Sequence, residues 1–181
     1  KELTGLNDWI FDVSITANRP DCQSIFGLAR EVAAALGQPL KTPALDYTET
    51  EVEKEGFEVT VDAQDLCPRY IAHYVYDVKL GQSPAWMRRR LALVGNNSIS
   101  NIVDITNYIM RELGQPLHAF DCDFLEGNAI QVRRAAEGEK IVTLDEKEFT
   151  LNPNNLVICD GKKPVALAGI MGGLNSEIRD T

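Results

Sequence analysis

The best candidate for acid–base chemistry in this chain is His118, one of only two histidines. It lies near the end of a run from Asn101 to Asp121 that reads NIVDITNYIMRELGQPLHAFD. The same run carries the hydroxyl of Thr106 and the amide of Asn107. Groups of this kind can orient a substrate and a water molecule through hydrogen bonds. A structural turn with an incidental histidine is the alternative, and the residue types do not separate the two.

The residues that lead to His118 predict an amphipathic helix followed by a stiff loop. An apolar row repeats every three or four residues, as a buried helix face does: Ile102, Ile105, Ile109, Leu113. The other side carries polar side chains: Asp104, Asn107, Arg111. Gly114 stands where a helix needs a left-handed residue at its end, and Pro116 cannot continue the helix.

Two further groups of residues were weighed as sites. Cys122 and His118 fall in one short loop, but no third residue that would orient a Cys–His pair is recognisable. The glycines of GIMGG, which include Gly172 and Gly173, form a weak phosphate motif because no strong helix follows them. Glycine does, however, allow a ligand to approach the backbone closely.

The four cysteines are widely separated and form no CxxC pair, which favours reduced thiols and predicts no metal site; a disulfide or a metal is the alternative.

The net charge of −9 argues against an extended nucleic-acid-binding face. The run Arg88–Arg90 lies on a predicted helix from Ser83 to Gly95. We interpret it as a solvated helix face, with a local RNA contact as the alternative.

The remaining sequence predicts an α+β fold. Helix 24–36 ends at Gly37, residues 41–56 form a polar linker or surface loop, and strands are expected at 9–16, 57–63 and 71–80, with His73 an ordinary strand residue. Five short strand candidates follow Gly127: AIQVRRA, KIVTL, EFTL, NLVICD, PVALAGI. Their irregular spacing favours a mixed or antiparallel sheet. No membrane span or signal peptide is recognisable, and the start without Met suggests a fragment of a longer chain.

Several segments resemble the β subunits of bacterial phenylalanyl-tRNA synthetases. They are VSITANRPDCQSIFGLAREVAAALGQPL, CPRY, NIVDITNYIMRELGQPLHAFD and ALAGIMGG with the serine that follows. They occur in that family's order and at about its spacing, over essentially the whole chain. The resemblance implies a layered β-β-α sandwich of the B3/B4 type. It also implies that residues 1–41 are the last part of the B1 region, a strand plus a helix, and that residues 42–181 are the B3/B4 editing module, truncated at its C-terminal end.

In this family the module hydrolyses tyrosine that has been esterified to tRNA(Phe) by mistake. The resemblance implies that His118 and Asn107 line the editing pocket. Our mechanistic hypothesis is that a positioned water molecule hydrolyses the ester, and that these two catalytic residues orient the ester and the terminal ribose. The resemblance also implies that Thr106, Gly172 and Gly173 line the substrate pocket. The family's glutamate that recognises the tyrosine hydroxyl lies downstream of Thr181, whereas Glu177 matches a surface turn. The isolated fragment is therefore expected to be inactive; a structural or tRNA-placement module is the alternative function.

The resemblance also implies partners and a location. The partners are the α subunit, in an α2β2 ligase, and the 3′ end of tRNA(Phe), with neither DNA nor membrane. ATP and Mg²⁺ serve the aminoacylation site of the holoenzyme, and no cofactor is expected within this chain. The expected location is the cytoplasm.

Overall fold

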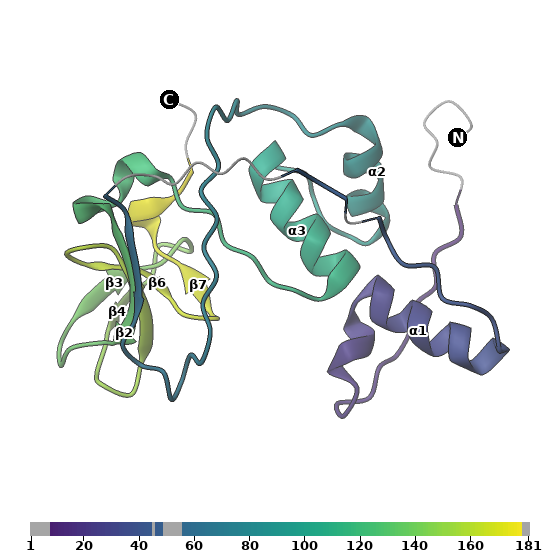
Figure 1. The fold of residues 1–181 in the computed structure, drawn as a ribbon, viewed down its shortest axis with the longest axis horizontal. Coiled ribbons are helices and arrows are strands. Elements are labelled where there is room, and N and C mark those ends of the chain that lie inside the picture. The colour runs from purple at the N-terminus through teal and green to yellow at the C-terminus, as the bar shows by residue number, and fades with distance from the viewer. Residues whose placement is uncertain (1–7, 45, 49–55, 179–181) are drawn as a thin grey trace. The chain divides into compact units, whose positions relative to one another are not determined.

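The computed structural model describes residues 8–44, 46–48 and 56–178. The described chain forms two compact units. The first contains residues 1–49 and 79–118, and the second contains residues 50–78 and 119–181. Figure 1 shows the helices α1–α3, which belong to the first unit, and the labelled strands, which belong to the second. Among the described helices, none has the length and apolarity needed to cross a membrane.

The helix α1 (Ile25–Leu36) begins and ends where the sequence predicts. Ser24 caps it by accepting a hydrogen bond from the backbone N–H of Gly27 at 3.0 Å. Gly37 ends it in the left-handed conformation, with φ of 61°. The predicted helix 24–36 is therefore confirmed.

The helix α3 (Asn101–Leu113) is also confirmed, with Ser100 as its N-cap and Gly114 in the left-handed conformation at its end. The prediction of its buried face was wrong at one position. Asp104 was assigned to the polar side, yet it is completely buried, while Ile105 is 43% exposed. A buried carboxylate is tolerated only with hydrogen-bond partners, and Asp104 has three.

The partners of Asp104 tie α3 to the helix α2 (Ala85–Leu93) and to the loop between them. The hydroxyl of Ser83 donates to Asp104 at 2.5 Å. The hydroxyl of Ser98 and the backbone N–H of Ile99 also donate to it, the latter at 2.9 Å. The sequence predicts a helix that starts at Ser83, but α2 starts at Ala85, with Pro84 as the N-cap residue and no side-chain cap. The hydroxyl of Ser83 binds the carboxylate of Asp104 and does not cap the helix.

The second unit is built on a mixed sheet of five strands in the order β1-β2-β5-β6-β7. Its strands are β1 (Glu58–Val61), β2 (Ala129–Arg134), β5 (Leu156–Cys159), β6 (Pro164–Leu167) and β7 (Met171–Gly172). β1 and β2 are parallel and the other pairs are antiparallel. The strands β3 (Lys140–Val142) and β4 (Glu148–Thr150) pair as a separate antiparallel hairpin. The α+β class with a mixed sheet is thus confirmed; the short β7 was not predicted.

β5 is the centre of this unit because both of its faces are buried. Val157 and Cys159 point into a cluster with Ile141 of β3, and so pack the hairpin against the sheet. Ile158 points to the opposite face, into a cluster with Val132 of β2. A strand buried on both faces reads as a continuous apolar run, which is how LVIC reads. The first cluster holds the hairpin against the sheet, and the second covers the sheet's opposite face.

Gly173 packs closely against β6. Its backbone N–H donates to the carbonyl of Val165 at 2.7 Å. A Cβ atom at this position would lie 2.6 Å from that carbonyl oxygen and 2.6 Å from Oδ1 of Asn175. Glycine is therefore required here for packing.

Two predicted strands are wrong. Residues 9–16 and 71–80 belong to no strand, and both segments expose apolar side chains, including Trp9, Phe11 and Val75. A strand needs a neighbour for its backbone groups, and the described part of the chain places none beside them. Half of the linker predicted at 41–56, residues 45 and 49–55, lies outside the described residues. The boundary between regions at 41/42 stays a prediction, and the two compact units interleave along the chain instead of dividing there.

We predict that Asp104→Asn destabilises the first unit by about 1–3 kcal/mol, because the amide leaves buried donors without an acceptor. Burial raises the pKa of Asp104, but the hydrogen bonds from Ser83, Ser98 and Ile99 outweigh it and the net pKa is lowered. The ionised carboxylate of Asp104 therefore stabilises the folded state at pH values above 3.8, the ordinary pKa of an aspartate. This stabilisation is lost as the pH falls through the lower pKa of Asp104 in the folded state. The cost measured by urea unfolding should therefore shrink in acid. Asp12→Asn, at an exposed position, is the matched control.

We also predict that Gly173→Ala destabilises the second unit by about 1–3 kcal/mol through overpacking against β6. Gly81→Ala is the control, since a Cβ there meets nothing within 4 Å. Equal urea midpoints for the two variants would contradict the close packing at Gly173.

Candidate functional site

The helix α3 holds two of the predicted site residues, Thr106 and Asn107, on adjacent positions. The hydroxyl of Thr106 donates to the carbonyl of Val103 at 2.7 Å, so its hydrogen is used within the helix. The hydroxyl oxygen keeps its acceptor capacity. Asn107 is half-buried, and its amide makes no hydrogen bond to another described residue. It is therefore able to bind a polar group of a ligand.

The loop after α3 begins with a tight packing contact. Gly114 has φ of 79°, and a Cβ there would lie 3.2 Å from Cβ of Ser24. The chain then passes Pro116, whose ring fixes φ, and reaches His118. His118 is exposed, but the protein atoms around its ring desolvate it and lower its pKa. The neutral imidazole, which can accept a proton, is thus favoured at neutral pH.

Gly172 and Gly173 lie at the end of the five-stranded sheet, and both are buried. Gly173 is needed for packing on β6, as shown above. A bulky residue at 173 would disturb the fold whether or not the glycine lines a pocket. Loss of activity in such a variant therefore cannot demonstrate a pocket wall at this position.

The predicted site residues divide between the two compact units. Thr106, Asn107 and His118 belong to the first, and Gly172 and Gly173 belong to the second. The pocket that would include all five stays a prediction.

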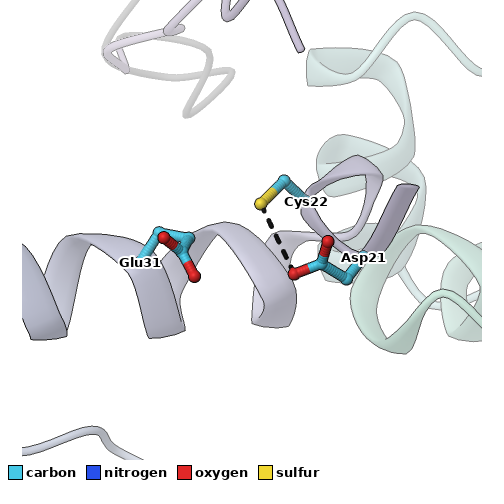
Figure 2. A group of neighbouring side chains, drawn as sticks. All are labelled: Asp21, Cys22 and Glu31. Carbon is cyan, nitrogen blue, oxygen red and sulfur yellow. Dashed lines mark hydrogen bonds between the residues drawn. The ribbon is translucent and has the colours of Figure 1, made fainter. Parts of the chain in front are cut away.

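A cluster that the sequence did not suggest involves Asp21, Cys22 and Glu31, whose possible ligand atoms lie within 4.8 Å of one another. Figure 2 shows the thiol of Cys22 directed at the carboxylate of Asp21. Arg19 already pairs with both carboxylates, at 2.8 Å to Asp21 and 2.5 Å to Glu31. Its hydrogen bond holds the pKa of Asp21 down to about 2. A metal ion would have to displace this guanidinium, so we interpret the cluster as an ion-pair network.

The cysteines are free thiols, which confirms the prediction of reduced cysteines. Burial raises the pKa of Cys159 to about 12 and also raises that of Cys22. Neither is suited to nucleophilic chemistry, which requires the thiolate. The remaining two, Cys67 and Cys122, are partly buried.

A second unpredicted cluster joins α2 to α3 around Trp86. The guanidinium of Arg90 lies over its ring, 5.5 Å from the centroid. The ring of Tyr108 meets it edge-on at 5.5 Å. Arg90 donates to the hydroxyl of Tyr108 at 2.5 Å, and that hydroxyl donates to Glu112 at 3.2 Å. Spacing of four along a helix could have indicated the pair Trp86–Arg90, but the contact with Tyr108 depends on how the helices pack.

Comparison with known proteins agrees with the resemblance found in the sequence. The chain is 57% identical over 182 residues to the phenylalanine–tRNA ligase β subunit of Syntrophus aciditrophicus, covering 98% of this chain and 22% of that protein. It is 53% identical to that of Geobacter metallireducens, covering 98% and 22%. It is 51% identical to that of Geobacter sulfurreducens, covering 99% and 23%. The chain thus spans under a quarter of the length of these relatives.

The B3/4 domain model matches residues 66–181, which is more than half of the chain. This match includes α2, α3 and all strands except β1. The chain therefore belongs to the B3/4 domain family, and over nearly all of its length it is similar to the β subunits of phenylalanine–tRNA ligase.

Proposed function

We propose that this chain is the editing part of a phenylalanine–tRNA ligase β subunit and that it hydrolyses tyrosine wrongly esterified to tRNA(Phe). The observation that carries the proposal is the constrained loop after α3. It holds His118, whose pKa is lowered, in the same unit as Asn107, whose amide makes no hydrogen bond to another described residue. The relatives are β subunits of the ligase by name. The ligase activity, ATP and Mg²⁺ belong, in this proposal, to the α2β2 holoenzyme in the cytoplasm.

The need for such a site is physical. Tyrosine differs from phenylalanine by one hydroxyl. An apolar amino-acid pocket at an aminoacylation site discriminates against a substrate with an added hydroxyl by only about a hundredfold. A second site that accepts tyrosine and hydrolyses its ester raises the overall accuracy. It can do so without a strong base, because an aminoacyl ester is already an activated substrate.

In the proposed reaction, water adds to the ester carbonyl. The bond to the terminal ribose then breaks, and the ribose oxygen takes up a proton. The products are tyrosine and tRNA with a free 3′ end. Neutral His118 accepts a hydrogen bond from the water and orients it, while the amide of Asn107 orients the ester or the ribose. We assign no covalent nucleophile.

We predict that His118→Ala in the full α2β2 enzyme slows deacylation of tyrosyl-tRNA(Phe) about 100-fold, because the attacking water loses its orientation. Release of labelled tyrosine measures the rate. His73→Ala is the matched control: it removes the other histidine, which is exposed in the segment 71–80. Equal rates in the His118 variant and the parent enzyme would show that the assignment is wrong. A parent enzyme without deacylation activity would favour the structural or tRNA-placement function instead.

We further predict a pH dependence that belongs to His118. Desolvation lowers its pKa below 6.5, so the active neutral form is present at neutral pH and is lost as pH falls through the lowered pKa. The deacylation rate, corrected for uncatalysed hydrolysis, should therefore drop in acid in the parent and in His73→Ala. The residual rate of His118→Ala should lack this step.

A further inference from the structure

The helix α2 carries three consecutive arginines, Arg88–Arg90, outside its buried stripe. The helix buries Met87 and Leu91, which fall on one stripe. At 100° per residue, Arg89 lies opposite that stripe, and Arg88 and Arg90 flank it. No acidic residue occurs within the helix. In a chain of net charge −9, this is a local concentration of positive charge, and it marks a surface complementary to anions.

The three arginines differ in how their charge is used. Arg88 is exposed and makes no hydrogen bond or ion pair with another described residue. Arg89 pairs through one terminal nitrogen with Asp8 at 3.1 Å, and both side chains are partly exposed. Its Nε is buried and has no hydrogen-bond partner among the described residues. Because that nitrogen is buried, only the terminal nitrogens of Arg89 are available to a phosphate, which would compete for them with the partly exposed Asp8.

Arg90 is held in place for recognition. It lies over the ring of Trp86 and donates to Tyr108, so its side chain is ordered before any ligand binds. Trp86 itself is 52% exposed. An ordered guanidinium beside a partly exposed indole ring suits nucleic acid. The arginine can bind phosphate groups, and the exposed part of the ring can contact a base.

We propose that the arginine face of α2, formed by Arg88–Arg90 and Trp86, binds the phosphate backbone of the tRNA that is presented for editing. The identity of the RNA rests on the proposed function. The helix α2 packs on α3 within the first unit, so bound phosphates are fixed to the same unit as Asn107 and His118. The face thereby helps to deliver the tRNA end to that unit. An acidic protein surface is the competing occupant, and the test separates the two.

The test uses the full α2β2 enzyme with the double variant Arg88→Gln, Arg89→Gln. Arg90 is left intact because it packs between the two helices. Arg30→Gln with Lys41→Gln is the matched control: it removes the same charge from exposed positions of the same unit. Binding of uncharged tRNA(Phe) is measured by fluorescence anisotropy over a range of salt concentrations, and assembly is measured by light scattering.

We expect the α2 variant to bind tRNA(Phe) about tenfold more weakly at low salt, with the slope of log Kd against log salt reduced by roughly 1.4–1.8 for two lost phosphate contacts. The control should match the parent enzyme. An unchanged slope and affinity would overturn the proposal. Loss of α2β2 assembly with tRNA affinity unchanged would also overturn it, because it would identify the face as a protein interface.

The same measurements keep this inference separate from the editing proposal. His118→Ala tests catalysis through the rate of tyrosine release, whereas the α2 variant is judged by its tRNA affinity and salt dependence. If His118→Ala deacylates normally while the α2 variant loses affinity, the editing assignment of His118 fails and the RNA-binding face stands.

Discussion

The buried carboxylate of Asp104 is the interaction on which the first unit depends. It accepts hydrogen bonds from the hydroxyl of Ser83, two positions before α2, and from the hydroxyl of Ser98 and the backbone N–H of Ile99 in the loop between α2 and α3. A carboxylate without water around it is stable only when such donors are present. The network therefore fixes three separate parts of the chain relative to one another, and it fixes the rotation of α3 about its own axis.

That rotation decides what the rest of α3 presents. Asn107 lies one turn after Asp104, and Tyr108 lies four residues after it. With Asp104 turned inward, Tyr108 contacts Trp86 and Arg90 of α2. Asn107 is half-buried, and its amide makes no hydrogen bond within the described part of the chain. The proposed catalytic group and the proposed RNA-binding face are thus set by the same buried contact.

The second unit also contains a buried, hydrogen-bonded aspartate that joins separate segments of the chain. Asp160, also buried, accepts hydrogen bonds from the backbone N–H groups of Glu126, Lys162 and Lys163. It closes the turn between β5 and β6 and joins that turn to the segment before β2. Close backbone packing of Gly173 on β6 completes this end of the sheet. In both units an aspartate that a hydropathy pattern places at the surface organises the interior.

The sequence by itself determined the elements whose signals are local. Caps and glycine stops defined α1 and α3, and apolar runs defined β2 to β6, because these depend on neighbours within a few residues. It also determined the family, through the motif that contains Asn107 and His118. Only the tertiary structure decided that Asp104 is buried and that Ser83 donates a hydrogen bond to it. It alone decided that residues 9–16 and 71–80 form no strand, because burial and strand pairing depend on partners far away in the sequence.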